Sequence, residues 1–260
     1  MFTAPNPGPK TLDGTHTFVV GRQETYVVDP GPATAQYQQF LAERLAANNH
    51  RVEGILLTHG HPDHAPGAIR LAELLRVPVW GSSRLQGSSL VVQIDERFTD
   101  DHHFQVDGDI LRVLPTPGHA PDHVAFWLER AGVLFSGDSI LGEGTTLVAP
   151  PEGNMVSYMR SLNLMRALRP RIIAPGHGPL VHDAMAKIDE YIEHRRRREA
   201  QLLEALGEGP ANLEELVQRT YVTTPSQLLP LAKASAEAQL IKLREEGKVE
   251  ERTGKYYLAG

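Results

Sequence analysis

The sequence predicts an α/β protein in which short strands alternate with helices and metal-binding side chains gather where strands end. The apolar segment 54–57 has the length of a buried strand, and segment 68–75 spaces apolar residues three and four apart, as a helix does. Between them, the stretch 58–67 holds three histidines and an aspartate within six positions. Because α/β folds bind ligands outside the carboxyl ends of their strands, this junction is the expected site.

A hairpin and a helix precede this junction. Segments 17–20 and 25–28 alternate apolar and polar residues around a short turn, as paired strands do. Asp29 ends the second strand near the expected site, where it either orients a metal-bound histidine or belongs to an ordinary turn. Segment 33–48 is the first predicted helix, with an apolar side made of Phe40, Leu41 and Leu45.

The strands after the junction are short and closely spaced. Segment 77–80 is a predicted strand, and segment 81–90 is a loop rich in serine and glycine. An Asp-Gly turn within 105–114 indicates a hairpin, and segments 124–128 and 133–136 form the next pair. This spacing is what a sandwich of two mixed sheets requires.

The long segment 140–153 has no periodicity and is predicted to be a loop over the site. It leaves directly from Asp138, and loops above a rigid site often determine the choice of substrate. Segment 154–168 follows as a helix with Tyr158 near its start. The Tyr158 phenol is a candidate substrate-binding group that would donate to a developing oxyanion, with packing in the core as the alternative.

Metal-ligand side chains recur at four strand ends. Imidazole and carboxylate are the ligands that borderline-soft divalent metals prefer, zinc first among them. In the 58–67 stretch, His59 and His61 can point to one side, whereas Asp63 and His64 lie on the bend into the helix, so two adjacent metals are expected. The alternative is a solvated loop with a chance run of histidine. Three later strand ends repeat the signal, each beside a glycine, with His119, Asp138 and His177.

The order of these motifs resembles the metallo-β-lactamase superfamily. The matching features are the HxHxDH motif, a later single histidine, an aspartate after a strand and a final histidine in a PGHG turn. The resemblance implies a four-layer αββα sandwich with two metals between its sheets. By position, it implies a first metal held by His59, His61 and His119, a second held by Asp63, His64 and His177, and Asp138 as the bridge.

The remaining seven histidines are expected on the surface or behind the ligands. His123, four residues past His119, is the one expected to support a ligand. The others are His16, His50, His102, His103, His182 and His194.

Two adjacent divalent metals lower the pKa of a bridging water, and the resulting hydroxide attacks an electrophilic carbonyl or phosphorus. Asp63 and Asp138 are therefore the expected catalytic residues, with Asp138 orienting the hydroxide. Zinc is the first expectation for the metal, and iron or manganese accept similar ligands.

After residue 183 the short strands give way to long helical stretches. This change predicts a catalytic domain at 1–183 and a small helical domain at 184–260. Segment 184–206 is helical, Asn212 is a predicted N-cap, and another helical stretch starts at Ser226. A hairpin follows Gly247, and this plan is that of a winged helix. The combination resembles two-domain β-lactamase-like proteins, whose group includes a mitochondrial single-strand endoribonuclease.

The charge of this tail disfavours duplex DNA as a partner. From Glu199 onward it has seven lysines and arginines against ten glutamates, a balance of −3. Arg195 to Arg198 form the better candidate for a phosphate contact, with a solvated helix face as the alternative. We expect the tail to wall one side of the cleft or to make a homodimer contact.

Composition argues against an antibiotic-degrading role and against a membrane protein. The chain has no cysteine, so it forms no disulfide and lacks the thiolate ligand of the familiar zinc β-lactamases. Segment 1–10 lacks the pattern of a signal peptide, and no apolar run approaches the roughly 18 residues of a membrane span. A cytoplasmic protein without membrane contact is expected, and its formal charge of −6 does not favour general binding of polyanions.

Three functions remain open at this point. The first is an endoribonuclease-like phosphodiester hydrolase of single-stranded RNA, based on the two-domain resemblance. The alternative is a glyoxalase II-like hydrolase of small esters, thioesters or lactones, which suits an acidic chain. The third is a winged-helix regulator that binds nucleic acid and uses its metal core only as a sensor.

Overall fold

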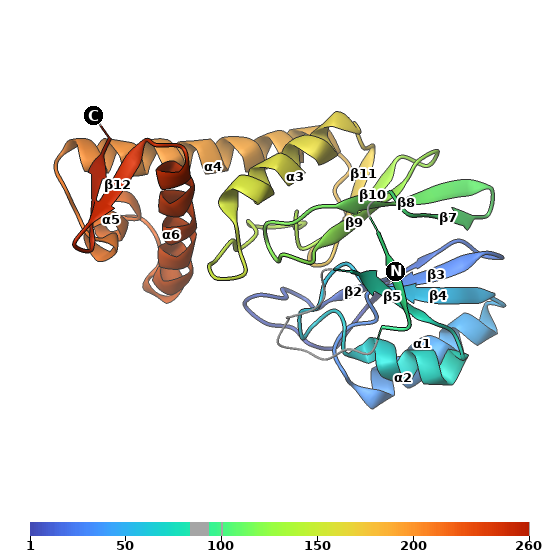
Figure 1. Cartoon of the computed structure of the whole chain (residues 1–260). Helices are drawn as coiled ribbons and strands as arrows, with labels where there is room; N and C mark the ends of the chain where they lie inside the picture. Colours follow the sequence, from blue (N-terminus) through green and yellow to red (C-terminus); the bar gives the residue numbers. More distant parts are fainter. Residues whose placement is uncertain (84–93, 100, 260) are drawn as a thin grey trace.

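The computed structural model describes residues 1–83, 94–99 and 101–259, and it shows two sheets packed face to face (Figure 1). The first sheet begins with antiparallel pairs and continues with parallel ones. Its described strands lie in the order β1 (Phe2–Thr3), β2 (His16–Val20), β3 (Thr25–Val28), β4 (Val52–Leu56), β5 (Val79–Ser82) and β6 (Glu96–Phe98).

The second sheet is antiparallel except for its last pair, β10 with β11. The Asp107-Gly108 hairpin predicted from the sequence joins its edge strand to the next one. Its order is β11 (Ile172–Pro175), β10 (Val133–Gly137), β9 (Val124–Leu128), β8 (Asp109–Pro115) and β7 (His103–Val106).

Helices cover the outer face of each sheet, which confirms the predicted four-layer arrangement (Figure 1). On the first sheet lie α1 (Ala35–Ala47) and α2 (Gly67–Leu75), and on the second lie α3 (Met155–Ala167) and the first part of α4 (Ala184–Gly207). Apolar side chains from both sheets fill the space between them, among them Phe18, Leu56, Leu111 and Phe126. Separate apolar clusters seal each helix layer against its sheet.

The prediction for Phe40 in α1 is wrong. The buried apolar stripe of this helix is Tyr37, Leu41 and Leu45, at four-residue spacing, and Phe40 lies beside it with 37% of its surface exposed. Its ring instead packs edge-on against Phe2, with the ring centroids 5.6 Å apart.

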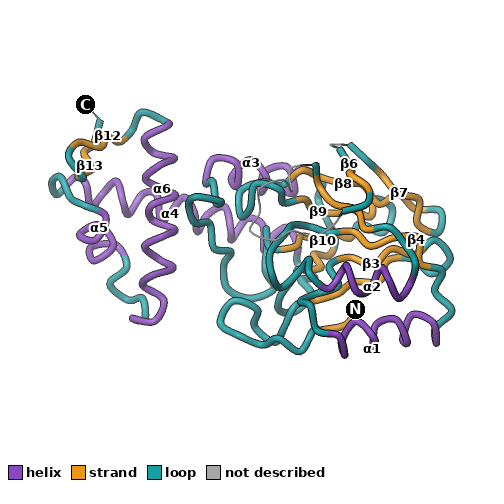
Figure 2. Tube along the Cα trace, turned by 60° about the horizontal axis from the view of Figure 1, so that its bottom comes forward, coloured by secondary structure: helices purple, strands orange, loops and turns teal. Residues whose placement is uncertain are grey.

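The C-terminal part has the predicted winged-helix plan (Figure 2). Asn212 caps its first short helix through a capping box, because the Asn212 side chain accepts from Glu215 N at 2.9 Å and Glu215 Oε2 accepts from Asn212 N at 2.9 Å. The hairpin turns at Thr253-Gly254 as expected. The elements are α5 (Leu213–Thr220), the 3₁₀ turn η1 (Ser226–Leu228), α6 (Leu229–Glu245), β12 (Val249–Arg252) and β13 (Lys255–Leu258).

Helix α4 belongs to both parts of the chain. Asp183 caps its start, at the predicted domain boundary, but the first half of the helix packs into the catalytic core through Ile188, Tyr191 and Ile192. The second half packs into the C-terminal core, where Leu202 lies. The division between the two cores therefore falls within α4 rather than before it, and Figure 1 shows this helix running from one part to the other.

The arginine run in α4 forms neither a phosphate-binding cluster nor one solvated face. Arg196 and Arg197 are exposed, but Arg195 is buried with 3% of its surface accessible. Arg198 lies over the Tyr221 ring, with its guanidinium carbon 4.3 Å from the ring centroid. None of the described helices is long and apolar enough to cross a lipid bilayer.

Replacing the Asn212 cap should destabilise the C-terminal domain. We expect Asn212→Ala to lower the free energy of unfolding by about 0.5–2 kcal/mol, because the capping box loses its side-chain acceptor for the Glu215 N–H. Urea denaturation measures the change. Gln218→Ala, an exposed substitution in the same helix, should stay within about 0.5 kcal/mol of the parent, and equal losses for both variants would refute the capping role.

Candidate metal centre

The structure brings all seven predicted ligand side chains to one edge of the sandwich. They form two groups that share Asp138, and the ligand atoms within each group lie within 4.8 Å of one another. The first group is His59, His61, His119 and Asp138, and the second is Asp63, His64, His177 and Asp138.

The first group converges on the Nδ1 atom of His61. His59 Nε2 and His119 Nε2 each lie 3.0 Å from this atom, and His119 Nε2 lies 3.6 Å from Asp138 Oδ2. Two of these rings therefore offer Nε2 and one offers Nδ1 to the same point.

The second group is more buried than the first. His177 Nε2 lies 3.2 Å from both His64 Nε2 and Asp63 Oδ2. Asp138 Oδ1 lies 3.2 Å from His64 Nε2 and 3.3 Å from His177 Nε2. Both histidines are fully buried, so the Asp63 carboxylate is the more open part of this group.

These spacings fit divalent metal ions. In a tetrahedral site with bonds of about 2.0–2.1 Å, ligand atoms lie about 3.3–3.4 Å apart, close to the separations found here. Asp138 Oδ1 is also buried without a directed hydrogen bond, as expected for an atom that binds a cation. Nitrogen and oxygen ligands without thiolate suit zinc, iron and manganese alike.

Asp29 holds the second group from behind. It lies just past β3 in a left-handed turn with φ of 50°, and its carboxylate accepts from Thr58 N at 2.8 Å and from Thr58 Oγ1 at 2.6 Å. The same carboxylate lies 2.9 Å from His64 Nδ1, which donates to it. The structure thus favours the orienting role of Asp29 over that of a plain turn residue.

Each of the other ligand histidines also has a partner for its second ring nitrogen. Such a bond fixes which nitrogen carries the proton and turns the other toward the metal position. His119 Nδ1 donates to the Leu147 carbonyl at 2.8 Å, and His177 Nδ1 donates to the Gly14 carbonyl at 3.1 Å. The remaining pairs are His59 Nδ1 with Thr58 Oγ1 at 2.9 Å and His61 Nε2 with Glu152 Oε2 at 3.3 Å.

His123 supports a ligand, as expected, but through the backbone. Its Nε2 accepts from Asp138 N at 3.1 Å, so its Nδ1 carries the proton and lies 2.9 Å from Thr116 Oγ1. Burial lowers the pKa of His123 well below its usual value, which keeps the ring neutral. The His123 ring thereby fixes the backbone that carries the Asp138 carboxylate.

The sequence reasoning missed Thr58, Asp122 and Glu152. Asp122 is buried and accepts from Gly60 N at 2.8 Å, which holds the turn between His59 and His61, and burial raises its pKa. Thr58 and Asp122 stand directly before His59 and His123, so adjacency to those histidines was the available signal. Glu152 comes from the long loop and carries no such mark.

Charges in the second group are tightly balanced. Although burial by itself lowers the pKa of His64, the carboxylates of Asp138, Asp29 and Asp63 raise it well above its usual value. Burial likewise opposes the protonation of His177, but Asp138 and Asp63 raise its pKa to about 9. Burial would raise the pKa of Asp138, yet the two histidines hold it well below the ordinary range. The site therefore demands positive charge, which protons or metal ions can supply.

Tyr158 does not face the ligands as a substrate-binding group. Its side chain is fully buried in the core under α3, and its hydroxyl donates to the Ser139 carbonyl at 2.7 Å. The packing alternative is the one that the structure supports. The loop 140–153, in contrast, lies against the site, because it supplies Leu147 and Glu152 to two ligand histidines.

Comparison with known proteins agrees with this geometry. Residues 11–177 match the metallo-beta-lactamase superfamily. The chain belongs to this superfamily. Residues 213–255 match the beta-lactamase associated winged helix domain, in agreement with the C-terminal fold.

The chain is similar to relatives over nearly its whole length. It is 35% identical to a beta-lactamase-like protein 2 homolog of Caenorhabditis elegans, covering 94% of this chain and 83% of that protein. It is 34% identical to an atrochrysone carboxyl ACP thioesterase of Aspergillus chevalieri, covering 95% and 80%. A metallo-beta-lactamase family protein of Thermus thermophilus aligns with a TM-score of 0.78 at 26% identity, covering 98% and 97%. The chain is thus a hydrolase of this superfamily, whose members typically bind divalent metals.

Replacing Asp29 should lower the affinity of the protein for the second metal and leave its affinity for the first metal nearly unchanged. We expect Asp29→Asn to lower the affinity for the second metal by about 10–100-fold, because both oxygens of Asp29 accept hydrogen bonds and an amide has only one acceptor oxygen. Its NH2 group would meet either Thr58 N or the Thr58 hydroxyl and His64 Nδ1. Metal retained against a graded chelator measures it. Asp109→Asn is the matched control and should keep both metals, because the hydrogen bonds described for that carboxylate come from the backbone N–H groups of Ile110, Arg130 and Ala131.

Once a chelator has removed the metals, the folded protein should become less stable as the pH rises from 6.5 to 9. The folded pKa of His177 is about 9, above the ordinary 6.5, so its protonated form stabilises the chelator-treated protein below pH 6.5. That stability is lost as pH rises through 9, and His64 acts in the same direction. We expect the Tm of chelated protein to fall from pH 6.5 to 9, with a smaller fall in His177→Gln. A flat Tm in chelated parent protein over this window would contradict the charge balance.

Proposed function

We propose that this protein hydrolyses small acyl thioesters or related esters, rather than RNA. The similarity to a protein named as an acyl carrier protein thioesterase, over 95% of this chain, is the observation that carries the proposal. It favours the small-substrate alternative over phosphodiester cleavage within the same hydrolytic chemistry.

Charges near the metal centre support the same choice. Two acidic side chains lie beside histidines there, with Glu152 Oε2 3.3 Å from His61 Nε2 and Asp13 Oδ2 3.9 Å from His16 Nε2. Glu152 is partly exposed at this point, with 42% of its side chain accessible. Acidic side chains at the rim of the site repel the phosphodiester backbone of RNA but do not repel a neutral thioester.

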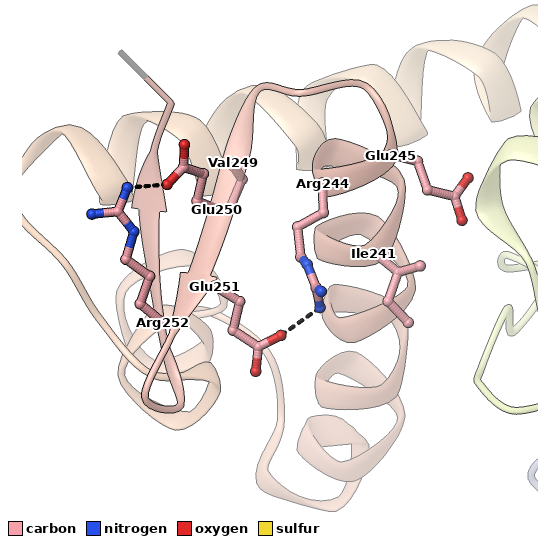
Figure 3. Close-up of a pocket in the computed structure, with 7 residues that line it drawn as sticks. All are labelled: Ile241, Arg244, Glu245, Val249, Glu250, Glu251 and Arg252. Carbon is pink, nitrogen blue, oxygen red and sulfur yellow. Dashed lines mark hydrogen bonds and ion pairs between the residues drawn. The ribbon is translucent and has the colours of Figure 1, made fainter.

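The C-terminal domain offers little free positive charge to nucleic acid. The basic side chains of α6, where a recognition helix would lie, are paired with glutamates: Lys233 with Glu214, Lys242 with Glu199 and Glu246, and Arg244 with Glu251. Figure 3 shows a hollow beside β12 in which Arg244 and Arg252 each face a glutamate. This pairing supports a domain that does not read a duplex.

Each group of the site can be given a role in thioester hydrolysis. When bound, two divalent metals would polarise the carbonyl and acidify a water. Asp63, with 24% of its side chain accessible against 13% for Asp138, is the ligand carboxylate best placed to take the proton of the attacking water. The oxygen–carbon bond forms, the carbon–sulfur bond breaks, and the sulfur leaves as a thiolate. Zinc is the first metal to test, with iron and manganese next.

A thioester of N-acetylcysteamine is the test substrate, and a colorimetric thiol assay measures the thiol that hydrolysis releases. The protein contains no cysteine and so contributes no background thiol. We expect metal-dependent hydrolysis that Asp63→Asn lowers by about 10²–10⁴-fold, as loss of a general base does. His177→Ala should abolish it by emptying the second site.

End-labelled single-stranded RNA is tested in parallel with the same metal-loaded samples. RNA cleavage that disappears in Asp63→Asn, without thioester hydrolysis, would refute the proposal in favour of a nuclease. RNA that stays intact while the thioester is consumed would support it.

A further inference from the structure

We propose that Arg195 is a positioning residue for the first metal, which it controls by holding the loop 140–153 against α4. The proposal rests on the metal binding argued above and not on the identity of the substrate. It also gives the C-terminal helical domain a role in the metal centre.

Arg195 is a buried cation without a carboxylate partner among the described residues. Its Nη2 donates to the Thr145 hydroxyl at 2.9 Å and to the carbonyl of Thr146. Its guanidinium carbon lies 5.2 Å from the centroid of the Tyr158 ring. All three partners belong to the loop 140–153 or to the helix that follows it.

The same few loop residues hold two ligands of the first metal. Thr146 Oγ1, itself buried, donates to the Asp138 carbonyl at 2.8 Å. The next residue, Leu147, supplies the carbonyl that accepts from His119 Nδ1 at 2.8 Å. A shift of the Thr146 peptide would therefore move the acceptor that fixes the orientation of the His119 ring.

Burying a guanidinium is costly, and an apolar side chain of similar size would fill the space without that cost. The carbonyl of Thr146 and the face of Tyr158 compensate the Arg195 charge only in this arrangement of the loop. Any loop conformation that withdraws the Thr146 carbonyl leaves the cation unpaired. Arg195 thus favours the one loop conformation in which His119 and Asp138 are held.

The C-terminal domain fixes Arg195 from the other side. Gln239 of α6, which is buried, donates to the Arg195 carbonyl at 3.2 Å. One turn further along α4, Arg198 donates to the Thr220 carbonyl at 3.3 Å and lies over Tyr221. The helix that carries Arg195 is therefore held by α5 and α6.

Of the loop contacts described above, the second metal shares only the one to Asp138, which belongs to both groups. His64 is oriented by Asp29 and His177 by the Gly14 carbonyl, and both partners lie in the N-terminal half of the chain. Loss of the Arg195 contacts should consequently affect one metal position more than the other.

The test is metal retention in full-length Arg195→Met, measured by elemental analysis after equilibration in graded metal buffers. We expect one of the two metals to bind about 10–100-fold more weakly, and the other to lose much less affinity. Arg195→Lys keeps the charge but not the fork of donors, so it should restore part of the lost affinity.

Two substitutions in the same helix are matched controls. Arg196→Met and Arg197→Met each remove an exposed arginine, so both variants should retain two metals. Parent-like affinity for both metals in Arg195→Met would overturn the proposal. Equal losses in Arg195→Met and Arg196→Met would also overturn it, because they would indicate general destabilisation.

If Arg195→Met does not fold, Thr146→Val tests the same connection with little change in volume. It removes the hydroxyl that donates to the carbonyl of Asp138, a ligand in both groups, so it should weaken metal binding, whereas unchanged binding would refute the connection. Metal content is measured without substrate, so a failure of the thioester proposal leaves these outcomes unaffected. A parent protein that binds no metal would instead refute the metal assignment itself.

Discussion

A buried set of carboxylates that needs positive charge is the constraint on which the rest of the structure depends. Asp29, Asp63 and Asp138 surround the His64 ring, which has no contact with solvent. Carboxylates at such separations repel one another in a medium from which water is excluded, and burial alone opposes their charged form. Protons on the histidines or bound cations are needed to offset this repulsion. The rest of the fold has to hold the carboxylates together against it.

The two sheets impose it by bringing strand ends to one edge. β3 and β4 are parallel neighbours in one sheet, and β10 and β11 are parallel neighbours in the other, so all four chain segments leave toward the site. The space there is so restricted that a Cβ on Gly176 would lie 2.7 Å from His64 Cε1 and 2.8 Å from Asp138 Oδ1. The glycine next to His177 is thus required by the density of ligands around it.

Local sequence predicted the parts of the site that follow directly from strand ends. The seven ligand side chains each stand just past an apolar run, and the order of motifs matched that of the superfamily, so their convergence could be inferred without coordinates. Asp29 and His123 were anticipated as supports of the ligands, but the partners of His119 and His177 could not be inferred in the same way. Leu147 and Gly14 act through backbone carbonyls, and a carbonyl leaves no mark in the residue type.

Tertiary packing also decided two questions about side-chain roles, in favour of the core alternative for Tyr158 and against both interpretations of the arginine run. Tyr158 stands at the start of a helix near the site, as a substrate-binding group would, but its hydroxyl is used inside the core by the Ser139 carbonyl. Four consecutive arginines look like one charged patch, yet successive helical residues point about 100° apart, so each meets a different environment. Arg195 faces the loop and Arg198 faces Tyr221, while the two between them are exposed.

This distribution bears on what a winged-helix domain does in a metal-dependent hydrolase. A domain used to read nucleic acid needs unpaired cations on an outer face, whereas here Lys242 of α6 and Lys248, which follows that helix, both pair with Glu199. Arg195, the buried cation of α4, points inward, to the loop over the metals. Because α4 contributes to the cores on both sides, the two domains cannot separate without dividing that helix's contacts. The contacts that connect the C-terminal domain to the loop over the site therefore lie on its inner side, through Gln239 and Arg195.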